Sequence, residues 1–354
     1  MRATTAFYKR RLIVGAAGLL LVLYLLPAAD EAVPVTRYHL AMDTLVKIDL
    51  FVDEAGSERF FELAITEIDR IDSLMSHYSP HSEVSEVNER AAQAPVAIAV
   101  DLSRVLERSI FFSRRTQGAF DVTLGALTDL WNFPEARVVP AKSAIDSALA
   151  VSGYQHLHLE DGRIHFAVDG LRLDLSASAK GYAVDRAIEI LEAAGVPAGV
   201  IEAGGDLRYW GSKPDGRPWR FGVQNPRFDD LPGADRFIPV ADIGLAAVAT
   251  SGDYERFFEF EGKRYHHVLD PRSGFPAGRS ISATVWAERA MDADILATAA
   301  FVMGPEAGLE LVKSLPNTEI LLFYENEGQL RRRASPAIRR LLTPSESAGA
   351  SAGN

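Results

Sequence analysis

The chain has 354 residues, 47% hydrophobic and 24% charged, a balance typical of one large core or two closely joined subdomains rather than of a disordered chain. Its 37 basic and 48 acidic residues give a net charge of −11, which disfavours a nucleic-acid partner. The absence of cysteine excludes disulfides, thiol catalysis and anchoring through a lipidated cysteine.

The chain opens with a basic cluster and an apolar run. Lys9, Arg10 and Arg11 precede the apolar residues 12–26, and small residues follow at 27–29. This layout predicts a signal peptide or membrane anchor over residues 1–29. The run is shorter than the about 20 residues of a membrane span, so anchoring and cleavage both stay open. We expect the rest of the chain on the extracytoplasmic, periplasmic side, either attached to the inner membrane by this segment or secreted after its cleavage.

The pattern of the remaining chain predicts a mixture of helices and strands. Helical periodicity covers 57–75, 101–116, 143–151, 181–194, 292–302 and 306–315. Strand-like runs cover 45–52, 163–168, 172–175, 200–201, 282–287 and 319–324. Because strict βαβ alternation is missing, an α+β fold is expected. We predict a linker at 30–36, a catalytic domain at 37–335 and a disordered tail at 336–354.

The segment 171–185 runs from a strand pattern into a helix pattern, with Asp174, Lys180 and Asp185 along the junction. Free N–H groups and the positive end of a helix dipole face outward at such a junction, so a phosphate beside a lysine would be well placed. Further on, the Gly-Gly pair in 202–206 allows a ligand to approach the backbone closely, although a tight turn is the simpler interpretation.

The segment 249–276 is crowded with polar residues between glycines and prolines. It contains Ser251, Asp253, His266, His267, Asp270 and Arg272. Two strand-like stretches within it can aim hydroxyl, imidazole and carboxylate groups at one point. The alternative is an ordinary hairpin with a solvated polar tip.

The segment 290–304 is periodic as a helix, with Asp292 suited to the N-cap and a glycine and a proline at the end. Asp294 and Thr298 are four residues apart and therefore share one helix face. Their oxygens are the ligand type that Mg²⁺ prefers. The alternative interpretation is that Asp294 is only a favourable charge near the helix N-terminus.

Eight blocks in order resemble the ApbE family, the FAD:protein FMN transferases, from about Arg37 to about Phe323. The blocks are MDTLVKI, IDSLMSHYSPHSEVSEVN, GAFDVTLGALTDLWNF, DLSASAKGYAVD, EAGGDLRYWG, ATSGDYERFF, YHHVLDPRSG and DADILATAAFVMG. The resemblance implies an ApbE-like, T-fold-related α+β domain with an FAD site between subdomains. In the first block Asp43 stands where the family usually has glycine. This difference puts the family's backbone geometry near the flavin in question for this chain.

The resemblance also implies an activity. Family members bind FAD with a divalent cation, usually Mg²⁺, and move its FMN half onto a Ser or Thr hydroxyl of an acceptor protein, releasing AMP. The acceptor expected here carries a Ser/Thr flavinylation motif and belongs to a membrane electron-transfer protein. By resemblance the FAD contacts are Met42, Tyr78, Ala119, Phe120, Asp121, Asp174, Lys180 and Leu269. The cation ligands implied are Asp294, Thr298 and the backbone carbonyl of Ala177, since alanine offers no side-chain oxygen.

His267 is the leading candidate for the general base, because an imidazole titrates near neutrality and the acceptor hydroxyl must lose a proton. His266 could serve instead, or His267 could donate a hydrogen bond to the pyrophosphate or be structural. Two other functions stay open. One is hydrolysis of FAD to FMN and AMP, and the other is storage of FAD without catalysis.

Overall fold

The computed structural model describes residues 32–133, 135, 137–228 and 236–342. The predicted signal or anchor at 1–29 lies outside these residues. Across the described ranges, no helix combines the length and the apolar character that a membrane crossing requires.

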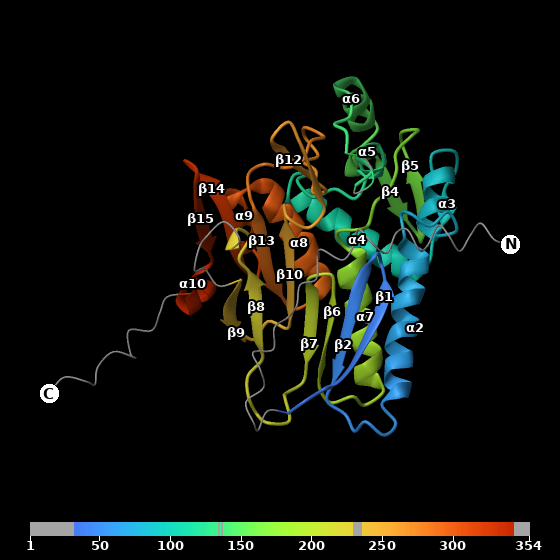
Figure 1. Ribbon diagram of the computed structural model, residues 1–354. Helices are drawn as coiled ribbons and strands as arrows, with labels where there is room; N and C mark the ends of the chain where they lie inside the picture. Colours follow the sequence, from blue (N-terminus) through green and yellow to red (C-terminus); the bar gives the residue numbers. More distant parts are fainter. Residues whose placement is uncertain (1–31, 134, 136, 229–235, 343–354) are drawn as a thin grey trace.

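An antiparallel sheet of eight strands forms the centre of the molecule (Figure 1). Its strands, in spatial order, are β1 (Val35–Ala41), β2 (Thr44–Leu50), β6 (Gly199–Ala203), β7 (Asp206–Trp210), β10 (Ala247–Gly252), β13 (Ser282–Ala287), β14 (Glu319–Asn326) and β15 (Gln329–Ala334). The pairing of β2 with β6 joins segments far apart in the sequence, with Val46 opposite Ala203 and Leu50 opposite Gly199.

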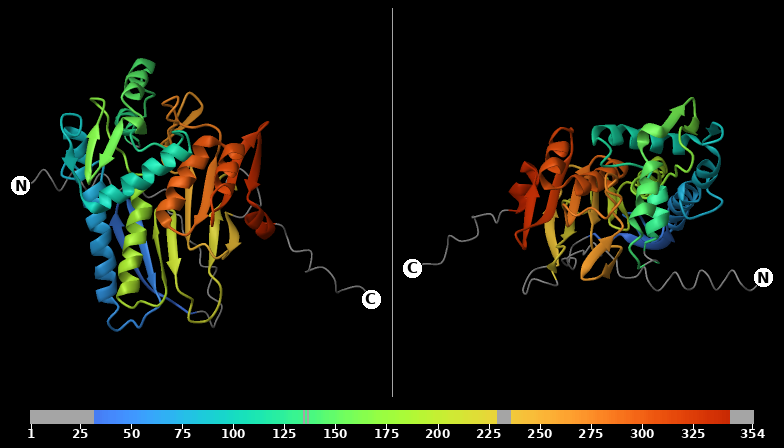
Figure 2. Two further views of the ribbon diagram at one scale, coloured as in Figure 1. Left: turned by 180° about the vertical axis from the view of Figure 1, so that it is seen from behind. Right: turned by 90° about the horizontal axis from the view of Figure 1, so that it is seen from above.

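Helices cover one face of this sheet, as the rear view in Figure 2 shows. They are α2 (Glu58–Met75), α4 (Val100–Arg115), α7 (Ala179–Ala193), α8 (Ala290–Met303) and α9 (Pro305–Lys313). The central helix α8 is buried on nearly all sides, which explains why its sequence is apolar almost throughout. Gly181 lets α7 approach α8 closely, because a Cβ there would lie 2.4 Å from the carbonyl oxygen of Ala290.

The opposite face of the sheet carries a second apolar core. The hairpin of β8 (Arg220–Gln224) and β9 (Phe237–Ala241) packs there together with α10 (Pro336–Leu342). The prediction of a disordered tail from residue 336 is therefore wrong for 336–342. Ile338 is fully buried in this core and holds the helix on the domain, while residues 343–354 lie outside the described part.

A smaller group of elements stands at one end of the large sheet (Figure 1). It contains α3 (Glu83–Arg90), α5 (Gly125–Trp131), α6 (Lys142–Ala150), η2 (Tyr154–His156), a three-stranded sheet of β3 (Val96–Ala97), β5 (Arg163–Phe166) and β4 (Leu157–Glu160), and the hairpin of β11 (Phe257–Phe260) and β12 (Lys263–His266). Trp131 centres its apolar cluster and stacks on Phe133 and Tyr265.

The mixed α/β architecture confirms the expected fold class, and three local predictions need correction. The segment 172–175 is not a strand, although Asp174 N donates a hydrogen bond to Val122 O at 2.8 Å. The expected linker at 30–36 overlaps β1, which already begins at Val35. Asp292 is not an N-cap but a first-turn residue, since α8 begins at Ala290.

Candidate functional site

Turns of the large sheet converge where the sheet meets the smaller group of elements. The β1–β2 turn consists of Met42 and Asp43, with φ of 54° and 56°. Aspartate tolerates this left-handed conformation better than most residues, which explains how it replaces glycine here. The β6–β7 turn is Gly204–Gly205, and a Cβ on Gly204 would lie 2.6 Å from Thr44 Oγ1. The two turns therefore pack side by side.

A lysine and two aspartates from three elements meet beside these turns. Lys180, in the first turn of α7, forms an ion pair with Asp206 at the start of β7. Its Nζ lies 3.4 Å from Asp294 Oδ2 on α8, and the backbone N–H of Gly181 lies 3.4 Å from the same oxygen. Burial lowers the pKa of Lys180, but the two carboxylates outweigh it and hold the pKa above its usual value. Lys180 is thus a fixed cation.

A third carboxyl group belongs to this cluster. Glu255, just beyond β10, is half-buried, and its enclosed Oε1 has no hydrogen-bond partner among the described residues. Burial and the nearby Asp206 raise the pKa of Glu255 to about 8 and that of Asp294 to about 7. One lysine faces three carboxyl groups, so the cluster has room for a further positive charge.

The hydroxyls of Ser251 and Thr298 close the cluster on the side of the sheet. Ser251 Oγ on β10 lies 3.1 Å from Thr298 Oγ1, which stands one helical turn beyond Asp294 on α8. Ala177 lies two residues before the first residue of α7. Within the described ranges, no three His, Asp or Glu side chains form a group that could hold a metal. The predicted ligand set contains only one carboxylate and would not form such a group.

The two adjacent histidines differ in their hydrogen bonds. His266 Nε2 lies 2.8 Å from Ala277 O, and its Nδ1 accepts from Val268 N at 3.3 Å. Both ring nitrogens of His266 are therefore engaged by the backbone. Among the described residues, the buried Nδ1 of His267 has no partner. Burial, then Arg256, lower the pKa of His267 to about 3, so its ring is neutral but is a weaker base than the ordinary imidazole that the sequence argument assumed.

The predicted flavin contacts divide into reachable and enclosed groups. Tyr78 is 42% exposed, and the charges of Asp174 and Asp43 act on its hydroxyl. Asp174 itself accepts from Thr128 Oγ1 at 2.7 Å and Ser176 N at 2.9 Å, which fixes its orientation. The backbone N–H of Met42 donates a hydrogen bond to Asp72 Oδ2 at 2.9 Å, which fixes this residue. Tyr78, Asp174 and Met42 thus come from three segments near the converging turns.

Of the remaining predicted contacts, Asp121 is half-buried and the three apolar residues are buried. Asp121 accepts hydrogen bonds from Thr123 and from Tyr154 N, which makes its carboxylate a brace for the turn. Ala119, Phe120 and Leu269 are buried apolar residues. Asp185, which the sequence places along the α7 junction, faces elsewhere: it accepts the N–H groups of Ala290 and Met291 and pairs with Arg208. It supplies the helix cap that the sequence assigns to Asp292.

Sequence reasoning missed three residues of this region. His77 lies between Asp129 and Leu173 O, at 2.7 and 3.0 Å, and Asp129 outweighs the effect of burial to raise the pKa of His77. Glu255 and Arg256 also stand at the site. All three lie within the blocks that resemble the family. Glu255 and Arg256 directly follow SGDY, and His77 directly precedes Tyr78, so their positions in the sequence could have pointed to them.

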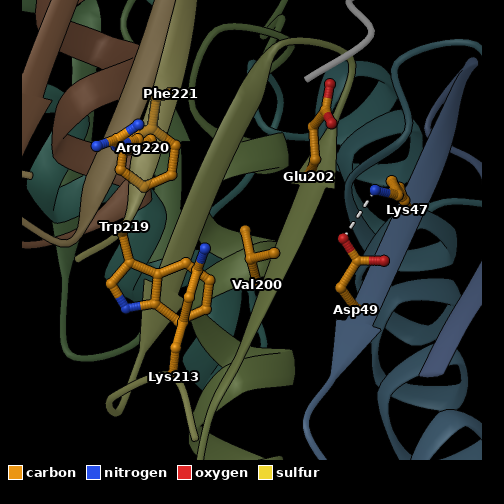
Figure 3. A pocket seen from close by; sticks show the side chains of 8 residues that line it. All are labelled: Lys47, Asp49, Val200, Glu202, Lys213, Trp219, Arg220 and Phe221. Carbon is orange, nitrogen blue, oxygen red and sulfur yellow. Dashed lines mark ion pairs between the residues drawn. The ribbon is translucent and has the colours of Figure 1, made fainter. Parts of the chain in front are cut away.

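A separate small pocket lies on the other face of the sheet (Figure 3). It is lined by Lys47, Asp49, Val200, Glu202, Lys213, Trp219, Arg220 and Phe221. Lys47 and Asp49 form an ion pair of 2.8 Å there. Asp294, Thr298 and Lys180 belong to elements on the helix-covered side, so this pocket is distinct from the converging turns.

The fold and the site define a mixed α/β enzyme with a buried cluster of charges at one end of its sheet. Residues 42–322 match the model of the ApbE family, and the chain belongs to that family. It is 35% identical over 286 residues to a FAD:protein FMN transferase of Vibrio cholerae, covering 78% of this chain and 84% of the relative. A Treponema pallidum protein of the same name is 32% identical over 322 residues, with 86% and 87% covered. The chain is accordingly an enzyme of the transferase class.

Solved structures agree with this assignment. The ApbE protein of Thermotoga maritima has a TM-score of 0.78 and 33% identity, covering 88% of this chain and 100% of its own. The flavin transferase ApbE of Vibrio cholerae has a TM-score of 0.78 and 31% identity, covering 87% and 99%. The likeness spans nearly all of both neighbours.

Proposed function

We propose that the chain is a Mg²⁺-dependent FAD:protein FMN transferase that moves the FMN half of FAD onto a Ser or Thr hydroxyl of an acceptor protein. The observation that carries the proposal is the buried cluster of Lys180 with Asp206, Glu255 and Asp294 beside the unpartnered nitrogen of His267. The names of the curated relatives support the coarser part of the proposal, the transfer of FMN from FAD to a protein.

The residues present fit a divalent cation. Asp294 is buried, and its contacts with Lys180 and Gly181 are both long, at 3.4 Å, so its carboxylate keeps unused acceptor capacity. Thr298 offers a hydroxyl on the same helix face, and the carbonyl of Ala177 would complete the set from the start of α7. A bound Mg²⁺ would supply electrostatic stabilisation for the phosphate oxygens.

The reaction balances with the groups at hand. The acceptor hydroxyl oxygen forms a bond to the phosphorus of the FMN half. The bond from that phosphorus to the bridging oxygen breaks, and AMP leaves with this oxygen. The acceptor proton passes to His267 Nδ1, whose ring is neutral; the negative charge of a bound pyrophosphate would have to raise the pKa of this ring from about 3 for it to act as the base. Lys180 holds a fixed positive charge beside the site, which favours binding of the pyrophosphate.

The proposal extends to the flavin contacts and to the setting of the enzyme. Tyr78, Met42 and Asp174 would receive the flavin half, with Ala119, Phe120, Asp121 and Leu269 shaping the wall behind it. The acceptor would be a membrane electron-transfer protein with a Ser/Thr flavinylation motif. The enzyme would act on the extracytoplasmic side, as the basic cluster and apolar run at its N-terminus indicate.

Quantifying AMP and covalent flavin together tests the proposal. The full chain would be incubated with FAD and Mg²⁺, with and without an acceptor that bears a Ser/Thr motif. Acceptor-dependent AMP matched by protein-linked flavin fluorescence is the expected result. AMP without labelling would instead identify a FAD pyrophosphatase, and bound FAD without AMP a storage protein.

Variants at the two histidines test the assignment of the base. His267→Ala should abolish most transfer while FAD still binds, because only His267 has a free ring nitrogen. His266→Gln is the matched control, because both ring nitrogens of His266 are already in hydrogen bonds with the backbone. This variant should keep most of the transfer activity. Transfer that survives His267→Ala would exclude His267 from the proton transfer.

A further inference from the structure

Arg256 is a half-buried arginine at the base of the β11–β12 hairpin. It directly precedes β11, and its carbonyl oxygen accepts a hydrogen bond from His267 N at 3.0 Å. His267 directly follows β12, so the two residues face each other across the base of the hairpin. This backbone bond fixes the points from which both side chains leave.

Among the described residues, the guanidinium of Arg256 has no carboxylate partner. In the part of the chain that the structure describes, it makes no hydrogen bond, ion pair or ring contact. Neighbouring cations behave differently: Lys180 contacts two aspartates, and Arg264 on the same hairpin lies 3.5 Å from Asp253. Because arginine stays charged at any accessible pH, a half-buried unpaired guanidinium costs free energy until an anion arrives.

The charge of Arg256 reaches two segments of the site. It contributes to the lowered pKa of His267, after burial, and it opposes the rise in the pKa of Tyr78. Tyr78 follows α2, whereas His267 follows β12, so the charge of Arg256 acts on groups from two separate segments. Glu255, its neighbour in the sequence, forms no ion pair with it and is itself predominantly protonated at neutral pH, with a pKa of about 8.

We propose that Arg256 binds the phosphate of the FMN half of FAD, with two N–H groups of its guanidinium on the nonbridging oxygens. The inference rests on the proposed function. Lys180 approaches from the α7–α8 side, while Arg256 approaches from the side of the hairpin, so the phosphate is held by a cation from each of two directions. A planar guanidinium matches two oxygens of one phosphate, and its charge meets the charge on these oxygens as the acceptor attacks.

Equilibrium binding of three flavins tests this assignment without turnover. The full chain, Arg256→Ala and Arg256→Lys would be titrated with FAD, FMN and riboflavin in the presence of Mg²⁺, following flavin fluorescence. Lys263→Ala is the matched control, because Lys263 is an exposed cation of the same hairpin that lies 5.2 Å from the ring of Tyr265. Transfer to the acceptor would be measured for the same four proteins.

Arg256→Ala should weaken FAD and FMN about 10- to 100-fold, the effect of losing charge-assisted hydrogen bonds, and leave riboflavin unchanged. Arg256→Lys should restore part of the loss, since it keeps the charge without the fork. The Lys263→Ala protein should behave as the parent. Unchanged FAD and FMN affinity, or an equal loss for riboflavin, would overturn the assignment.

The binding contrast also separates this inference from the proposed reaction. If the parent chain yields neither AMP nor covalent flavin while Arg256→Ala discriminates FMN from riboflavin, the phosphate contact stands and the transferase proposal fails. If the parent transfers FMN and the alanine variant does so with unchanged kcat/KM and affinity, the transferase proposal stands and the role of Arg256 is refuted.

Discussion

The close approach of α7 to α8 at Gly181 predicts that Gly181→Ala destabilises the protein. A Cβ at this position would lie 2.4, 2.5 and 2.6 Å from backbone atoms of Ala290 and Met291. Ordinary contact begins at 3.4 Å, so the two helices must separate by about 1 Å. Both neighbours are main-chain atoms of a buried helix and cannot rotate away, which makes the substitution an overpacking of the core.

Two opposing free energies set the size of the effect. Overpacking of a core costs about 1–3 kcal/mol, and a clash with backbone belongs at the upper end. Alanine returns about 1 kcal/mol in helix propensity. The expected net loss is therefore about 2 kcal/mol. Lys180 should also move away from Asp294, so FAD binding should weaken together with stability.

Urea unfolding of the full chain measures this loss. The Gly181→Ala midpoint should fall at an unchanged slope. Gly278→Ala is the matched control: that glycine is exposed, and a Cβ there would meet no atom within 4 Å. Its midpoint should stay within about 0.5 kcal/mol of the parent. A Gly181→Ala protein at least as stable as the parent would refute the reasoning.

Three further substitutions have expected outcomes. Burial raises the pKa of Glu255 from 4.5 to about 8. The free energy of unfolding of the protein should therefore fall by up to about 5 kcal/mol as pH rises through that interval. Urea unfolding without divalent cations should show that Glu255→Gln lacks this loss of stability. A stability–pH profile of the variant that runs parallel to that of the parent would contradict the prediction. Burial lowers the pKa of His267 from 6.5 to about 3, so acid should cost the parent stability that His267→Gln retains between these pH values. Equal acid midpoints would argue against a buried neutral ring. Asp185→Asn should cost about 3–5 kcal/mol by leaving Arg208 without its carboxylate and weakening the α8 cap, and a thermal midpoint equal to the parent's would exclude that role.

Elements with a strong single-face pattern were predictable from the sequence. The helix expected at 57–75 is observed at Glu58–Met75, and the strand at 282–287 has the expected bounds. The periodicity works because one face of each element enters the core. Short elements of the smaller part, such as α3 and α5, carry too few turns for a clear period and were missed.

The site was only partly predictable, because spacing does not show how side chains pair across segments. The four-residue spacing of Asp294 and Thr298 indicated a shared helix face. The contact of Lys180 with Asp206 depends on the pairing of β6 with β7 and on the packing of α7, neither of which spacing reveals. Asp185 lies along the junction that the sequence marks as a site, but its carboxylate binds the first N–H groups of α8 instead.

The pairing of β2 with β6 has a consequence for biosynthesis. Leu50 cannot pair until Gly199 has been made, and synthesis of the 149 residues 51–199 takes about 7–30 s at 5–20 residues per second. During that interval the backbone edge of β2 that later pairs with β6 has no partner strand, while Val46, Ile48 and Leu50 of the same strand are apolar residues that are fully buried only in the finished fold. A nascent chain in this state is a natural client for a chaperone, and stalling synthesis before residue 199 should make it aggregate.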